Sequence, residues 1–102
     1  MRIDLKANET VVKATNTLHS SGTAEFKGKL VLTNQRIYFI SAQREAEAYD
    51  FEILPNQISE VIYYNVFRFF PKGLELKTKE GISLKFTMKD RDTWCRMIVS
   101  MN

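Results

Sequence analysis

The sequence predicts a mainly β protein (α+β by content), namely a seven-stranded antiparallel sandwich or barrel capped by one C-terminal α-helix. Apolar and polar residues alternate from residue 11 to residue 88, and these runs recur at regular spacing between turn residues. The last segment then changes to a helical period. Alternation indicates strands with one buried and one solvated face, because successive side chains point to opposite sides of a sheet. The length of 102 residues leaves no room for a second core, so we expect a single domain over residues 1–102.

Seven alternating runs define the expected strands. They cover residues 11–18, 28–33, 36–42, 48–54, 59–66, 73–79 and 82–88. Two tight turns join neighbouring runs. Thr33–Arg36 joins the second and third, with Asn34 suited to turn geometry, and Lys79–Gly81 joins the last two, where Gly81 can take a positive φ.

The final segment carries an apolar stripe at helical spacing, formed by Trp94, Met97, Ile98 and Met101. We expect this stripe to face the sheets. Asp90 and Asp92 precede it, where a carboxylate can cap the first turn and favour the positive end of the helix dipole. The sequence therefore predicts a helix that runs to the C-terminus.

Charge and composition exclude several classes of protein. Fifteen basic and twelve acidic residues give a net charge of +3, and the charges are scattered. A basic residue near an anionic membrane contributes about 1 kcal/mol, whereas micromolar affinity needs roughly 8 kcal/mol, so bulk charge cannot supply binding. Neither a basic groove nor an RNA-binding signature is present, so we expect no nucleic-acid partner. With one cysteine, no signal peptide and no membrane-spanning run, we expect a cytoplasmic protein that can associate peripherally with membranes.

Several motifs together carry a family resemblance. They are Gly28-x-Leu30-x-Leu32-Thr33-x-x-Arg36-Ile37-x-Phe39, Asn8-Glu9-x-Val11 after Leu5, Phe51-x-Ile53 before Ile58 and Val61, Lys79-Glu80-Gly81 before Phe86, and Asp92-x-Trp94. In this order the motifs resemble those of a GRAM domain, a member of the pleckstrin-homology (PH) superfold, here as a stand-alone single domain. The resemblance implies two nearly orthogonal antiparallel sheets of four and three strands, with the helix plugging one end. It also implies a non-enzymatic binding module, since family members mostly bind partners and the better-known ones contact phosphoinositides.

Ligands of PH-like folds often engage an open end formed by three loops, which here correspond to residues 19–27, 43–47 and 79–81. These loops and their flanks carry Lys27, Lys29, Arg44 and Lys79 against Glu25, Glu45, Glu47 and Glu80. That end is therefore close to neutral, whereas phosphate sites usually gather cations with little opposing charge. A second basic group lies on the last predicted hairpin. Together the candidate surface for an anionic ligand comprises Lys77, Lys79, Lys85, Lys27 and Lys29, although exposed strand lysines also discourage edge pairing.

Arg36 has two interpretations. It is a possible phosphate ligand, but its place just past the turn favours a brace that hydrogen-bonds backbone carbonyls with its forked donors.

The densest aromatic segment supplies the candidate surface for a partner, formed by Phe67, Arg68, Phe69 and Phe70. If this loop protrudes, its rings form a patch suited to a protein, a second copy of the chain or a bilayer interface. The alternative is that most of these rings pack around Trp94 in the core. We expect a protein partner or self-association, with anionic-lipid contact as the alternative.

Catalysis has little support in the sequence. His19 is the single histidine, so neither a multi-histidine metal site nor a convincing base–nucleophile pair can be built. Cys95 lies next to Trp94 on the predicted helix, where we expect a half-buried, inert thiol. We therefore expect no catalytic residue, no metal and no cofactor.

Overall fold

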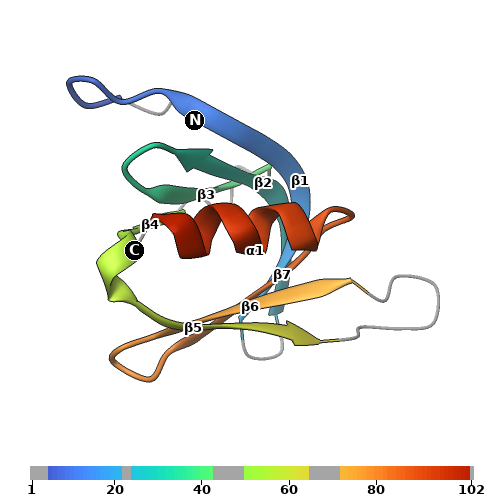
Figure 1. Ribbon diagram of the computed structural model, residues 1–102. Coiled ribbons are helices and arrows are strands. Elements are labelled where there is room, and N and C mark those ends of the chain that lie inside the picture. The colour runs from blue at the N-terminus through green and yellow to red at the C-terminus, as the bar shows by residue number, and fades with distance from the viewer. Residues whose placement is uncertain (1–4, 22–23, 43–49, 65–71, 102) are drawn as a thin grey trace.

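The computed structural model describes residues 5–21, 24–42, 50–64 and 72–101 (Figure 1). Its strands are β1 (Val11–Ser21), β2 (Ala24–Thr33), β3 (Ile37–Ser41), β4 (Phe51–Ile53), β5 (Ile58–Tyr64), β6 (Gly73–Thr78) and β7 (Ser83–Thr87). A short 3-10 helix, η2 (Pro55–Gln57), precedes β5, and α1 (Arg91–Ser100) is the last element. The strands form one antiparallel sheet in the order β4-β3-β2-β1-β7-β6-β5. The predicted fold class, seven antiparallel strands with one C-terminal helix, is thus confirmed.

The sheet bends so that β2–β4 and β5–β7 lie on opposite sides, and α1 crosses the opening between them (Figure 1). Buried side chains from both sides form the core: Leu30, Leu32, Ile37, Phe39, Ile53, Ile58, Leu74, Leu76, Phe86 and Met88. From α1, Trp94 and Ile98 are fully buried in this cluster, while Met97 and Met101 pack against it partly exposed. The predicted apolar stripe therefore faces the sheet and closes the core.

β1 joins the two sides of the sheet, but it pairs with them unequally. It pairs with β2 from Val11 to Ser21. With β7 it pairs only at Leu18–Thr87, His19–Phe86 and Ser20–Lys85. The residues of β1 before Leu18 do not pair with β7, because β7 ends at Thr87 and the chain then turns toward α1.

The expected loop 19–27 is wrong, because β1 and β2 extend through most of it. Segment 19–27 is rich in polar residues, and this composition led to the expectation of a loop. His19 faces Phe26 across the two strands, and the His19 ring is buried among aromatic side chains. The strand alternation thus continues through a histidine that looks polar in sequence. Lys27 consequently lies on a strand and not in a loop.

The remaining strands lie within the expected segments or differ from them by one residue at an end, although β4 is shorter than the expected 48–54, of which residues 48 and 49 are outside the described residues. Both predicted turns are confirmed. Thr33 N–H donates to the Arg36 carbonyl over 2.9 Å, and Gly81 has a φ of 89°. In the described part of the chain, no helix is both long and apolar enough to span a bilayer.

Candidate functional site

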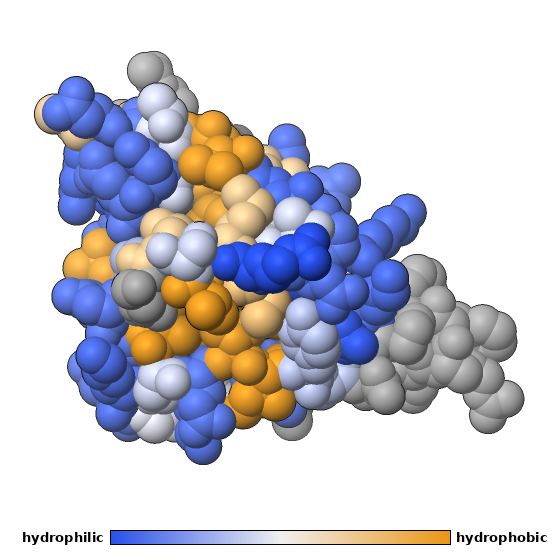
Figure 2. Space-filling model, viewed as in Figure 1, coloured by the Kyte–Doolittle hydropathy of each residue, from blue (hydrophilic) through white to orange (hydrophobic). Residues whose placement is uncertain are grey.

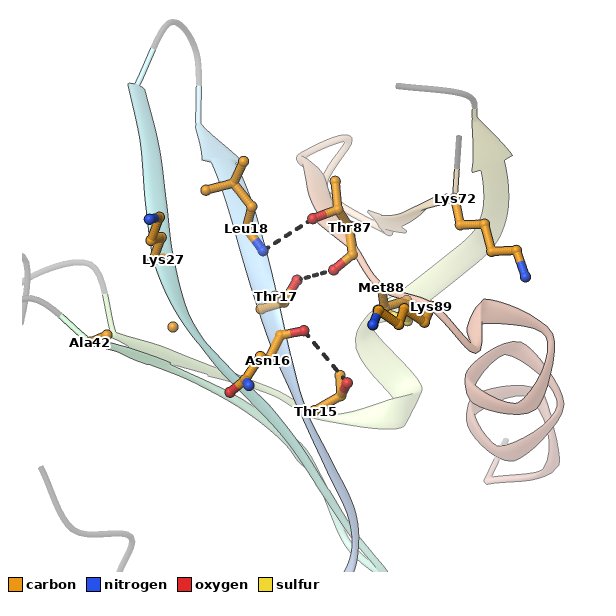
Figure 3. A pocket seen from close by; sticks show the side chains of 11 residues that line it. Thr15, Asn16, Thr17, Leu18, Lys27, Ala42, Lys72, Thr87, Met88 and Lys89 are labelled. Carbon is orange, nitrogen blue, oxygen red and sulfur yellow. Dashed lines mark hydrogen bonds between the residues drawn. The ribbon is translucent and has the colours of Figure 1, made fainter. Parts of the chain in front are cut away.

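Three lysines line one hollow of about 900 Å³ where β1 and β7 separate. Lys27 comes from β2, Lys72 directly precedes β6, and Lys89 follows β7, so they lie on different sides of β1 (Figure 3). We call this hollow the three-lysine pocket. Its other lining residues are uncharged: Thr15, Asn16, Thr17, Leu18, Gly28, Ala42, Thr87 and Met88. No carboxylate is therefore among the described residues that line it.

Backbone hydrogen bonds hold two of these lysines at their places. The Lys27 carbonyl accepts from the Ala42 N–H over 2.8 Å, and the Lys72 carbonyl accepts from the Met88 N–H over 3.1 Å. Lys89 follows Met88 in the chain, so the second bond also brings the Lys72 and Lys89 segments together. Residues distant in sequence thus line one hollow.

The wall between the lysines is built on Thr87. The Thr17 hydroxyl donates to the Thr87 carbonyl over 2.7 Å, and the Leu18 N–H donates to the Thr87 hydroxyl over 3.2 Å (Figure 3). Because the Thr87 hydroxyl accepts in this bond, the bond does not consume its own O–H donor. The pocket therefore combines cations, a hydroxyl and apolar surface from Leu18 and Met88.

The five lysines predicted as an anionic-ligand surface fall into different charge environments. Lys27 and Lys29 lie opposite the uncharged Leu18 and Asn16 of β1. On the last hairpin and its neighbour β5, each strand lysine has a glutamate opposite instead. Lys77 faces Glu60, and Lys85 faces Glu75.

The structure brings only Lys27 of those five into the three-lysine pocket. Lys85 lies over the Tyr64 ring, with 5.4 Å from its Nζ to the ring centroid. Lys79 borders a second hollow of about 630 Å³ between β4 and the β6–β7 hairpin, together with Glu52 and Glu80. That second hollow carries mixed charge.

Sequence reasoning missed Lys72 and Lys89. Lys72 follows the aromatic segment and Lys89 precedes the helix, so neither lies in a loop that the resemblance marked as ligand-binding. No local sequence pattern could have found them, because the pocket depends on where β1 and β7 separate in the fold.

The predicted partner surface at Phe67, Arg68, Phe69 and Phe70 lies outside the described residues, and so do Arg44, Glu45 and Glu47 of the expected open end. A protein partner at that segment stays a prediction.

Arg36 braces the β2–β3 hairpin, and two carboxylates that were not predicted are among the partners of its guanidinium. Its Nε and Nη2 donate to the two Glu9 carboxylate oxygens, each over 2.8 Å, and Nη1 donates to Glu52 over 2.5 Å. The Glu9 carboxylate also accepts from the Thr33 hydroxyl over 2.6 Å and from the Lys6 N–H over 2.8 Å. Burial alone would raise the pKa of Glu9, but these hydrogen bonds and the Arg36 charge lower it to about 2. The guanidinium is thereby committed to the fold.

The residues considered for catalysis have separate partners. The His19 ring contacts Phe39, Phe51 and Phe86, whereas Cys95 lies on α1 and is half-buried, as expected. Within the described ranges, no three His, Cys, Asp or Glu side chains are placed to hold a metal ion.

The expectation for the helix start needs one correction. Asp90 occupies the N-cap position of α1 without making a side-chain cap hydrogen bond, and its carboxylate instead binds Lys13 of β1 over 2.6 Å. The carboxylate reaches across to β1 because a cation is available there.

Comparison with known proteins identifies the family. The model of the GRAM domain matches residues 1–102. A solved structure of the C-terminal domain of an unknown protein from Leishmania infantum is 25% identical, with a TM-score of 0.78, covering 93% of this chain and 85% of that chain. The Vps36 N-terminal PH domain is 17% identical, with a TM-score of 0.69, covering 95% of this chain and 84% of its own.

The Slm1-PH domain, solved in complex with inositol-4-phosphate, is 14% identical, with a TM-score of 0.62 and coverage of 91% and 94%. The search of curated proteins gave no match. GRAM and PH-like domains are typically binding modules without catalytic activity. Since the family match spans the whole sequence and the sheet and helix superpose on PH-domain structures, this chain belongs to the GRAM domain family and has the PH-like fold.

Proposed function

We propose that this domain binds a phosphate-bearing anion in the three-lysine pocket. One observation carries the proposal: Lys27, Lys72 and Lys89 line one hollow from three segments, and its described lining contains no carboxylate. Phosphate groups are held by convergent cations, and hydrogen bonds between ammonium and phosphate groups are roughly twice as strong as neutral ones. The hollow brings three lysines to one part of the molecule, although the whole chain has a net charge of only +3.

The apolar part of the pocket narrows the ligand class. Leu18 and Met88 line the same hollow and provide carbon surface. A phosphorylated polyol or a lipid headgroup presents carbon next to phosphate and can use both kinds of surface. The Slm1-PH domain, which has the same fold, was solved in complex with inositol-4-phosphate, a ligand of this class.

Binding is tested with two probes that separate a lipid source from a soluble one. The first is co-sedimentation with phosphatidylcholine vesicles that contain phosphatidylinositol phosphates, and the second is calorimetric titration with inositol-4-phosphate. Lys27→Gln, Lys72→Gln and Lys89→Gln should each weaken binding about tenfold, since hydrogen bonds to charged groups contribute roughly 1.5–3 kcal/mol. Binding to vesicles alone indicates a membrane lipid, and binding to both probes indicates recognition of the headgroup itself.

The matched control is Lys77→Gln, which removes the same charge from a strand position opposite Glu60. It should leave affinity within about twofold, because surface charges beyond a Debye length of about 10 Å are largely screened. Equal losses for Lys77→Gln and the pocket variants would refute a localised site. Absence of binding to both probes at low salt would refute the proposal altogether.

A protein partner or self-association is the second candidate. Apolar surface gathers along the middle of the face that α1 crosses (Figure 2). Val99 on α1 is 55% exposed, and Tyr63 on β5 is 44% exposed. Such surface is suited to burial against another protein.

A further inference from the structure

We infer that Lys13 and Asp90 form a strap that positions Lys89 in the three-lysine pocket, an inference that rests on the proposed function. Asp90 directly follows Lys89, and its carboxylate binds the Lys13 ammonium over 2.6 Å. Lys13 lies on β1, two residues before Thr15, which lines the pocket. The ion pair therefore joins the β1 wall of the pocket to the segment that carries Lys89.

The strap lies where the backbone provides no ladder between these walls. β1 and β7 pair only at Leu18–Thr87 and the two following positions along β1. Before Leu18 the two strands separate, and the pocket occupies that separation. A side-chain link beyond the last ladder pair limits how far the walls can move apart.

The Asp90 carboxylate has no competing role at the helix start. It occupies the N-cap of α1 but accepts no hydrogen bond from the first turn. A cap carboxylate normally accepts the N–H of the second or third helical residue. At Asp90 the carboxylate binds Lys13 instead, which favours a role in fixing the 88–90 segment over a role in helix capping.

A different explanation is purely electrostatic. In that case Lys13 and Asp90 act on a bound anion only through their charges. Removing the Asp90 charge would then make the site more positive and tighten anion binding, whereas removing Lys13 would weaken it. The strap predicts weaker binding for both changes, because either change releases Lys89. The sign of the effect of Asp90→Asn separates the two explanations.

The experiment measures binding of Asp90→Asn, Lys13→Met and Lys13→Arg to inositol-4-phosphate and to the phosphatidylinositol phosphate vesicles. Asp90→Asn and Lys13→Met should each weaken binding about two- to fivefold, in line with the strength of a partly exposed ion pair. Lys13→Arg keeps the pair and should stay close to wild type. The charge exchange Lys13→Asp with Asp90→Lys should recover most of the affinity, since it restores the link with its charges reversed.

Asparagine is as good an N-cap residue as aspartate, so Asp90→Asn should preserve α1, and a thermal unfolding midpoint near that of wild type checks this. Tighter binding by Asp90→Asn, or no recovery in the charge exchange, would overturn the strap. If Lys89→Gln also left binding unchanged, the proposed pocket would fail too. A loss with Lys89→Gln but a gain with Asp90→Asn would overturn the strap alone.

Discussion

His19 is a titratable ring inside the aromatic core. It is 3% exposed and stacks on Phe86 with 4.8 Å between the ring centroids, while Phe39 and Phe51 pack against it at 5.0 and 5.1 Å. Its Nδ1 lies 3.0 Å from the Lys85 carbonyl, so we assign the proton of the neutral ring to that nitrogen. Burial lowers the pKa of His19 below 6.5, although the hydrogen bond to Lys85 opposes this shift.

This environment predicts a pH-dependent stability. The unfolded chain takes up the His19 proton near its ordinary pKa of 6.5, while the folded chain resists protonation. The contribution of the neutral His19 ring to the free energy of unfolding is therefore fully present above pH 6.5. As the pH falls below 6.5, this contribution is lost with a slope of up to about 1.4 kcal/mol per pH unit. His19→Phe keeps an aromatic ring and should abolish the slope between about pH 6.5 and 5 in urea unfolding. An unchanged slope in His19→Phe would assign the dependence to another group.

Arg36 illustrates what the sequence can predict for a single residue. Its place after a tight turn, within a recognisable hairpin pattern, predicted a brace. Its partners were not predictable from that pattern, because Glu9 is 27 residues away and Glu52 is 16 residues away. Glu9 belonged to the same family motifs, but only the fold shows that the N-terminal segment packs against this hairpin.

At the scale of secondary-structure elements, one glycine on a strand and one in a turn are needed for different reasons. A Cβ on Gly28 of β2 would collide with the Ile40 carbonyl of β3 and come within 2.8 Å of the Phe39 ring. Gly81 has open space around it but a φ of 89°. Gly28 is thus needed for close packing of strands, and Gly81 for backbone conformation.

Asparagine discriminates between these purposes because it tolerates positive φ better than other residues with a side chain. Gly28→Ala should cost about 1–3 kcal/mol of unfolding free energy through overpacking, and Gly81→Ala about 1–2 kcal/mol through backbone strain. Gly81→Asn should be more stable than Gly81→Ala, because asparagine tolerates the positive φ. Gly28→Asn should lower the free energy of unfolding more than Gly28→Ala does, because its side chain is larger. Urea unfolding measures all four, and recovery by asparagine at position 28 would disprove the packing argument.

The strands were predictable wherever one face of the strand is buried in the core and the other is exposed to solvent. β6 and β7 have this pattern, and their ends lie within one residue of the expected ones. The turn region of β1 and β2 was not predictable, because buried His19 interrupts the apolar pattern. Local alternation reports burial only when the buried residues are apolar.

The three-lysine pocket was not predictable from element positions. Counting charges by expected loops gave a neutral open end and left out Lys72 and Lys89, which lie outside those loops. Lys72 and Lys89 come together through the Met88–Lys72 hydrogen bond and the early end of β7. Both features depend on where β1 and β7 stop pairing, which no local pattern encodes.

At the scale of the molecule, the distribution of charge matters more than its sum. Cross-strand glutamates oppose Lys77 and Lys85 on one part of the sheet, whereas the pocket lining is free of carboxylates in the described chain. A net charge of +3 can thus coexist with a locally basic site. Selective loss of binding in the pocket variants is the expected consequence of that distribution.

The mass of the molecule in solution distinguishes the two proposed functions. The three-lysine pocket takes its cations from one chain, so anion binding needs only the 11.9 kDa monomer. Self-association through the exposed surface that includes Val99 predicts instead a mass that rises with concentration in sedimentation experiments, and Val99→Asp should return it to that of the monomer. Ile82→Asp is the matched control, since Ile82 is 52% exposed but lies at the β6–β7 turn. A wild-type mass that stays monomeric at all concentrations would exclude self-association and leave the anion site intact.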